Sequence, residues 1–134
     1  MHTPIRRALW MAALSIFAVG ASFAAGPQSD QAPAAIIHMT INKQYVPKEV
    51  TISVGDTVEW VNDDPQHEHD VSTSKDETEN PKAIELPKGA KPFSSGLMPY
   101  GKRWRHRFTV AGTYRYICLP HQPRMVGTIV VRPD

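Results

Sequence analysis

Short segments in which apolar and polar residues alternate make up most of the chain after residue 35. Residues 50–54 alternate in this way, Gly55 and Asp56 follow as a turn, and residues 57–62 continue the pattern. A period of two residues between turn residues predicts half-buried β-strands. On the same grounds we expect strands at four other segments: 36–41, 69–73, 113–118 and 125–132.

A further predicted strand, within residues 103–110, divides its side chains by chemistry. One face would carry four largely apolar side chains, those of Trp104, His106, Phe108 and Val110. The other face would carry the side chains of Arg103, Arg105 and Arg107. Because no apolar repeat of 3.6 residues persists in the chain beyond residue 35, no major helix is expected.

About eight short strands separated by turns predict an all-β fold, a β-sandwich closed by Greek-key connections. The 134 residues allow one domain of this kind. The polar stretch 74–91 is the exception, because it is interrupted by Pro81 and Pro87. We expect it to form a long loop or a short helical insert.

The N-terminus has the three parts of an export signal. Two arginines give a positive start, an uncharged apolar run follows, and Ser22-Phe23-Ala24 places small residues where a signal peptidase cleaves. A retained membrane anchor is the alternative interpretation. We therefore predict three segments: a signal peptide over 1–24, a flexible leader over 25–35 and one domain over 36–134.

Cleavage after Ala24 also changes the charge balance. The whole chain carries 15 Lys and Arg against 13 Asp and Glu, and the signal contains two of the basic residues and none of the acidic ones. The mature chain of 110 residues, which is 134 less 24, is therefore neutral in sum. A neutral chain lacks the basic excess of nucleic-acid-binding proteins. We expect a periplasmic monomer with no nucleic-acid partner and no membrane span in its mature form.

The chain has a single cysteine, Cys118. One cysteine excludes an internal disulfide, a zinc ribbon, an iron–sulfur cluster, a redox dithiol and covalent haem attachment. A free thiol in an oxidising compartment would be oxidised unless something protects it. Cys118 therefore needs an explanation.

That explanation is suggested by the neighbours of Cys118. A thiolate, an imidazole and a thioether, those of Cys118, His121 and Met125, fall within eight residues on a predicted loop. Soft sulfur ligands together with imidazoles suit copper, and a blue-copper site needs one Cys and two His in a plane with a weak axial Met. The second imidazole must then come from elsewhere, and His67 and His69 are the upstream candidates.

At these residues the chain resembles the cupredoxins, the blue copper proteins of the plastocyanin, amicyanin and pseudoazurin group. The first half of the resemblance lies in VTISVGDTVEWVN at 50–62 and in His69-Asp70-Val71. The second half lies in four motifs: Phe93-Ser-Ser-Gly96, Phe108-Thr-Val-Ala-Gly-Thr-Tyr114, Tyr116-x-Cys118-x-Pro-His121 and Met125-x-Gly127. The resemblance implies a cupredoxin-like sandwich with one copper ion and four ligands: His69, Cys118, His121 and Met125.

The choice of His69 over His67 follows from the residues after each histidine. In the family, a small polar residue and then an aliphatic one follow the ligand, as Asp70 and Val71 follow His69. His67 lacks this context, and we expect it to lie in a loop. His38 and His106 lack it too, and we expect them to be structural or surface residues.

The chain departs from the family pattern in two ways. Asp70 stands where the family usually has Asn, so its side chain can accept but not donate hydrogen bonds between the ligand loops, and it adds negative charge near the metal. Three residues separate His121 from Met125, whereas plastocyanin-like and pseudoazurin-like members have four and amicyanin-like members two, so the subfamily stays open. Pro120 fits the pattern, because without an N–H it cannot donate a hydrogen bond to the Cys118 sulfur.

The resemblance implies that this chain is not an enzyme but a one-electron carrier cycling between Cu(I) and Cu(II). Its implied partners are redox proteins met transiently, such as a c-type cytochrome, a dehydrogenase or a terminal reductase. Electrons would leave through His121, inside an apolar surface patch that also includes Leu97, Met98, Pro99, Leu119, Pro120 and Pro123. A copper carrier or copper-resistance protein on the same fold is the alternative.

Overall fold

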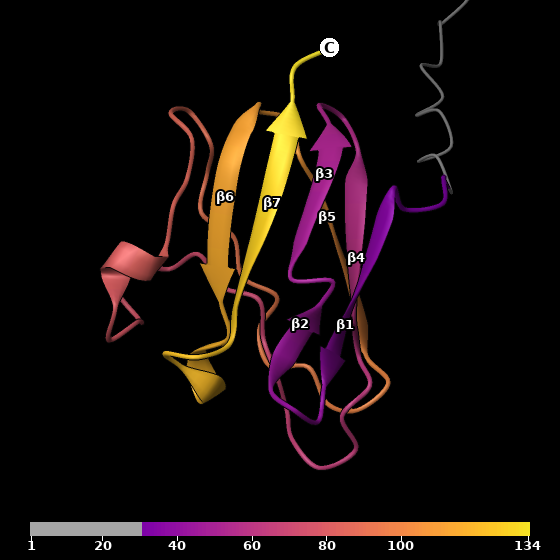
Figure 1. Ribbon diagram of the computed structural model, residues 1–134, viewed down its shortest axis with the longest axis vertical. Coiled ribbons are helices and arrows are strands. Elements are labelled where there is room, and N and C mark those ends of the chain that lie inside the picture. Colours follow the sequence, from indigo (N-terminus) through magenta and orange to yellow (C-terminus); the bar gives the residue numbers. More distant parts are fainter. Residues whose placement is uncertain (1–30) are drawn as a thin grey trace, which may run out of the picture. The chain divides into compact units, whose positions relative to one another are not determined.

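The computed structural model describes residues 31–134, which form two β-sheets packed face to face (Figure 1). The predicted signal peptide and the first residues of the predicted leader lie outside the described part. The described strands are β1 (Ala35–Thr40), β2 (Gln44–Val46), β3 (Glu49–Ser53), β4 (Thr57–Asn62), β5 (Arg103–Arg107), β6 (Gly112–Ile117) and β7 (Val126–Arg132). None of the helices in residues 31–134 is long and apolar enough to cross a membrane.

Each sheet combines parallel and antiparallel pairs. The first sheet has the order β2-β1-β4-β5, with β1 parallel to β4 and β5 antiparallel to it. The second has the order β3-β7-β6, with β7 parallel to β3 and antiparallel to β6. Strands that follow each other in the chain therefore lie in different sheets at β2–β3, β3–β4 and β5–β6, which makes the chain cross between the layers.

The core lies between the two sheets and is built by the alternation seen in the sequence. Ile37 and Met39 of β1 are fully buried, while the alternate residues Ile36 and His38 are exposed. The largest buried side chain, Trp60 of β4, meets the second sheet, where its indole Nε1 donates a hydrogen bond of 3.2 Å to the Tyr116 hydroxyl. Alternating strands thus supply one apolar face each to a shared core.

Strand β5 keeps the predicted separation of its two faces. Trp104 and His106 are partly buried, and the three arginines are exposed. Arg103 and Arg105 both bind the carboxylate of Glu59, a β4 residue that is only 4% exposed; the Arg105 Nε to Glu59 Oε2 distance is 2.6 Å. Two of the arginines therefore hold strands β4 and β5 together.

The all-β sandwich expected from the sequence is confirmed, with two corrections at the level of strands. Residues 69–73, expected to form a strand, make only isolated bridges through His69 and Ser72, because their neighbours 94–98 and 117 pair with them at single positions. The short strand β2 was not predicted. The described part of the chain thus has seven strands rather than about eight. The polar insert at 74–91 contains a single turn of 3₁₀ helix, Pro81–Ala83.

Candidate metal centre

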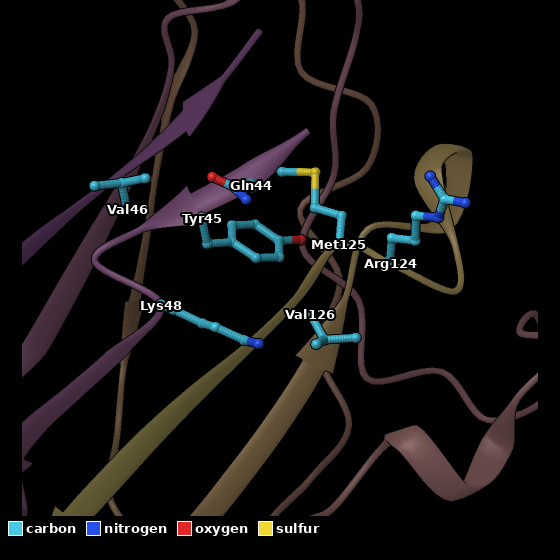
Figure 2. A pocket seen from close by; sticks show the side chains of 7 residues that line it. All are labelled: Gln44, Tyr45, Val46, Lys48, Arg124, Met125 and Val126. Atoms are coloured by element: carbon cyan, nitrogen blue, oxygen red, sulfur yellow. The ribbon is translucent and has the colours of Figure 1, made fainter. Parts of the chain in front are cut away.

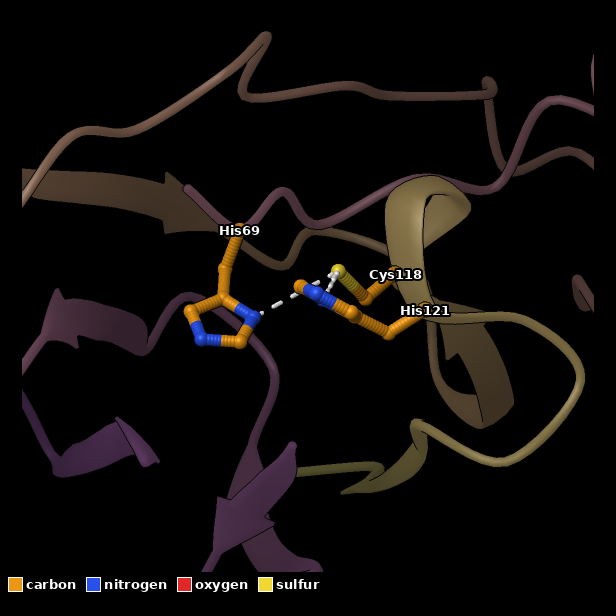
Figure 3. A group of neighbouring side chains, drawn as sticks. All are labelled: His69, Cys118 and His121. Atoms are coloured by element: carbon orange, nitrogen blue, oxygen red, sulfur yellow. Dashed lines mark hydrogen bonds between the residues drawn. The ribbon is translucent and has the colours of Figure 1, made fainter. Parts of the chain in front are cut away.

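Three potential metal ligands from two distant parts of the chain converge at one end of the sandwich (Figure 3). The Cys118 Sγ lies 3.7 Å from Nδ1 of His69 and 3.4 Å from Nδ1 of His121. All three donor atoms lie within 4.8 Å of one another. His69 and Cys118 are fully buried, and His121 is partly buried. The group is therefore shielded from bulk water on all but the His121 side.

The loop after β6 holds its ligands through its own backbone. Cys118 follows the last residue of β6, and a short 3₁₀ helix, Leu119–His121, reverses the chain. The N–H of Met125 donates to the His121 carbonyl at 3.2 Å, and the N–H of Cys118 donates to the Met125 carbonyl at 2.9 Å. These bonds fix the three residues relative to one another before any metal binds.

His69 reaches the centre from a different loop, between β4 and β5. Its backbone pairs with Met98 in both directions, at 3.3 Å and 2.8 Å. The Asn62 side chain at the end of β4 secures the same region, since its Nδ2 donates to the carbonyls of His67 at 3.0 Å and Met98 at 2.7 Å. These hydrogen bonds hold the backbone of His67 and of His69 in place.

Asp70 joins the two ligand loops. Its Oδ1 accepts a hydrogen bond of 2.7 Å from the Leu119 N–H, and its own backbone N–H points at the Cys118 Sγ, 3.4 Å away. The Tyr45 hydroxyl donates to the Asp70 carbonyl at 2.5 Å. Asp70 thus accepts the hydrogen bond between the loops, as its acceptor-only carboxylate allows.

A second buried carboxylate, that of Asp64, contacts His69 from behind. Its Oδ2 lies 3.0 Å from the His69 Nε2 and 2.8 Å from the His67 Nδ1. Its Oδ1 accepts from the backbone N–H groups of Gln66 at 2.8 Å and His67 at 3.2 Å. Burial by itself would raise the pKa of Asp64, but these hydrogen bonds hold that pKa well below the usual value. The local pattern does not single out this residue, because Asp-Asp-Pro is typical of an exposed turn.

The two imidazoles already have the protonation state that a metal requires, whereas the thiol must lose its proton on binding. Burial raises the pKa of the Cys118 thiol to about 12, so an isolated thiolate is strongly disfavoured there and a bound cation would have to compensate its charge. Burial lowers the pKa of His69 and of His121, which keeps both imidazoles neutral and able to donate a lone pair. One thiolate and two neutral imidazoles are the equatorial donors that a blue-copper site requires.

Met125, expected as the axial ligand, is 1% exposed and packs in the hydrophobic core. It also borders a pocket of about 240 Å³. Figure 2 shows the Tyr45 ring beside Met125, with Lys48 and Arg124 at the edges of this pocket. The thioether thus lies between the interior and this pocket, while His69, Cys118 and His121 do not line it.

The predicted apolar patch around His121 is largely at the surface, with one correction. Leu97 is 55% exposed, and Pro99, Pro120 and Pro123 are exposed too. Leu119 is partly buried. Met98 is wrong as a patch residue, because its backbone pairing with His69 turns its side chain into the core, where it is 0% exposed.

Tyr100 was not included in that prediction, and it is 67% exposed in the same loop as Leu97 and Pro99. The other histidines within residues 31–134 are His38, His67 and His106. His38 makes an exposed hydrogen bond with the Asp63 carboxylate, and the His106 ring packs on Phe93 with ring centroids 4.2 Å apart. His67 lies in the loop before His69, partly exposed.

The comparison with known families agrees with this geometry. Residues 36–132 match the model of the copper binding proteins of the plastocyanin/azurin family. A plastocyanin from Nostoc punctiforme is 33% identical over 130 residues, which cover 91% of each chain. An amicyanin from Paracoccus versutus is 30% identical over 133 residues, which cover 90% of this chain and 92% of the amicyanin.

A solved structure with the same fold is that of a copper-containing nitrite reductase from Thermus scotoductus, at a TM-score of 0.62 and 29% identity. The match covers 83% of this chain but only 25% of the reductase. The chain belongs to the plastocyanin/azurin family of copper-binding proteins, the cupredoxins. Its cofactor is copper, and the group formed by His69, Cys118 and His121 has the donor atoms to bind it.

Proposed function

We propose that this protein is a periplasmic one-electron carrier in which His69, Cys118, His121 and Met125 hold a single copper ion. The observation that carries the proposal is the buried convergence of the Cys118 sulfur with two imidazole nitrogens at 3.4 and 3.7 Å. Copper bound there would supply a Cu(I)/Cu(II) couple. With four protein ligands there is no free position for a substrate, which favours electron transfer over catalysis.

The scaffold around the ligands supports a carrier. The hydrogen bonds of Asp70, Asn62 and the 118–125 loop hold the donor atoms in place through bonds among protein groups alone. Ligands fixed in this way keep their positions when the charge on the metal changes, so each electron transfer requires little rearrangement.

The exposed side of the centre supports transfer to another protein. His121 is the ligand nearest the surface, and exposed Leu97, Pro99, Pro120 and Pro123 belong to the predicted patch around it. A small apolar surface permits brief contacts with redox proteins such as a c-type cytochrome, a dehydrogenase or a terminal reductase. The export predicted for residues 1–24 would place the protein in the periplasm with them.

The proposal is tested by the colour of the copper-loaded protein. A thiolate bound to Cu(II) in this geometry gives an intense visible absorption. We expect this band in the wild type and its loss in Cys118→Ser, which keeps the size of the side chain but removes the thiolate. A copper-loaded wild type without the band would overturn the blue-copper site.

A second measurement separates an electron carrier from a protein that delivers copper. The carrier keeps its metal when challenged with a chelator and exchanges electrons rapidly between its oxidised and reduced forms. Ready loss of copper to the chelator together with slow electron exchange would instead favour the copper-delivery function.

A further inference from the structure

We propose that Asp64 is a positioning residue for the metal centre, fixing the proton of His69 on Nε2 so that Nδ1 is free to bind the metal. The proposal rests on the assignment of His69 as a ligand. It adds a residue that neither the ligand motifs nor the family resemblance indicated, and it names what that residue does.

The first step is the placement of the carboxylate. Asp64 is 0% exposed, and its Oδ2 lies 3.0 Å from the Nε2 of His69, on the opposite side of the ring from the Cys118 sulfur. An ionised carboxylate can only accept hydrogen bonds, so the Nε2 of His69 must carry the proton in that bond. A neutral imidazole with its proton on Nε2 presents a lone pair at Nδ1, the atom that faces Cys118.

The second step is that the carboxylate itself cannot turn away. Its Oδ1 accepts from the N–H groups of Gln66 and His67, and the Asp64 N–H donates to the Asn62 Oδ1 at 2.8 Å. Because Asn62 also binds the carbonyl of Met98, the partner of His69, the loop 62–69 forms one connected network. Asp64 therefore lies at a fixed place behind the ring.

The third step concerns His67, which shares the same Oδ2 at 2.8 Å. Its side chain is 36% exposed, and its ring centroid lies 5.6 Å from that of His121. His67 is thus the outer member of a set that runs from the buried ligand to the surface: His69, Asp64 and His67. It helps satisfy the buried carboxylate without being required for the contact with His69.

The test uses Asp64→Asn, which keeps the shape of the side chain. Its amide oxygen can retain the two backbone bonds, which leaves an NH₂ group facing the imidazoles. An NH₂ donor favours an unprotonated Nε2. The proton of His69 then lies on Nδ1, which no longer has a lone pair for the metal. We expect copper affinity to fall by about 10- to 100-fold, and the reduction potential to rise because a negative charge near the metal is lost.

The decisive readout is the tautomer of His69 in the metal-free protein, measured by long-range ¹H–¹⁵N NMR. We expect a protonated Nε2 in the wild type and in His67→Phe, and a protonated Nδ1 or a mixture in Asp64→Asn. Asp63→Asn is the matched control, since it removes the neighbouring carboxylate, which is exposed and pairs with His38 instead.

A proton on Nδ1 of His69 in the wild type would overturn the proposal, whether or not the variant folds. So would an Asp64→Asn protein whose His69 tautomer and reduction potential match those of Asp63→Asn. The NMR measurement is made without copper, so it stands apart from the test of the proposed function: a colourless copper-loaded wild type leaves the tautomer result unaffected.

Discussion

Asp70 is a single residue with two roles at the centre. Its carboxylate accepts from Leu119 and so ties the ligand loops together, and its backbone N–H points at the Cys118 sulfur. It is buried, at 4% exposure, and burial raises the pKa of its carboxyl. The family resemblance implies an uncharged Asn at this position, whereas Asp70 brings an ionisable carboxyl to the centre.

The Asp70→Asn variant should therefore keep the hydrogen bond from Leu119 while it removes the negative charge. Asn keeps an acceptor for the Leu119 N–H, so the copper absorption band should stay at nearly the same wavelength. At a pH high enough to ionise the Asp70 carboxyl, the reduction potential of the variant should be higher than that of the wild type, since a unit charge a few ångströms away shifts the redox energy by on the order of 1–3 kcal/mol. Voltammetry of both proteins measures the shift, with the exposed Asp76→Asn as control; equal potentials for all three would contradict it.

Single residues also show where prediction from sequence succeeds and fails. Cys118, His121 and Met125 were predicted as a group because they lie within eight residues and their chemistry is distinctive. Met98 was misplaced because its burial depends on a tertiary contact, the backbone pairing with His69. Asp64 was missed although its hydrogen-bond partners lie within five residues of it, because no simple residue pattern shows which groups its carboxylate contacts.

At the scale of elements, strand β7 lies close against the Tyr116 side chain of β6 at Gly127. A Cβ added there would overlap the Tyr116 ring, reaching Cε2 at 2.8 Å. The ring is held between Tyr45 and Trp60, with centroids 4.7 Å and 5.6 Å away, and it accepts the Trp60 hydrogen bond. It therefore has little room to move aside.

We expect Gly127→Ala to lower the free energy of unfolding by about 1–3 kcal/mol, the usual cost of overpacking a core. Urea unfolding of the metal-free protein measures this directly. Thr128→Ala, at the next and less buried position of β7, serves as the control and should change stability much less. Similar stabilities for the two variants would contradict this prediction, because they would show that the Tyr116 ring moves aside at little cost in stability.

Strand β5 gives a prediction about pH. Burial lowers the pKa of His106, whose ring lies against Phe93 and Trp104, so the folded protein keeps it neutral. As pH falls below the unfolded value of about 6.5, the unfolded chain gains a proton that the folded chain resists. The titration of His106 therefore lowers the free energy of unfolding in acid and does not affect it above about pH 7.

His106→Phe keeps an aromatic ring in the stack and removes this titration. We expect the metal-free variant to lose less stability than the wild type between pH 7 and pH 5, as measured by urea unfolding at each pH. Parallel losses in the two proteins would contradict the assignment of this pH dependence to His106.

The elements were predictable where the alternation was long. The range 57–62 coincides with β4, the range expected at 36–41 is offset from β1 by one residue, and the range expected at 125–132 begins one residue before β7. The three residues of β2 are too few to show a period, and they pair with β1 through a turn at Lys43, which has a left-handed φ of 57°. At 69–73 an alternating pattern was present, but the partner segments meet it only at single bridges.

At the scale of the whole molecule, the metal should stabilise the fold as a ligand of the native state alone. At free copper about 1,000 times the dissociation constant, the gain is about 4 kcal/mol. For a domain of about 100 residues this corresponds to a rise in Tm of at least about 15 °C. Calorimetry of the copper-loaded and metal-free proteins measures it, and Cys118→Ser should show a much smaller rise.

Cys118 follows His69 by 49 positions, which places one proposed ligand in the middle of the domain and the other proposed ligands close to its end. During synthesis or secretion, the Cys118 loop becomes available only after nearly all of the chain has emerged. That loop is shaped by β6 and β7, and β7 in turn pairs with β3 from the first half. The complete ligand set thus exists only in a chain whose two halves have assembled, so copper uptake is a late event that marks the end of folding.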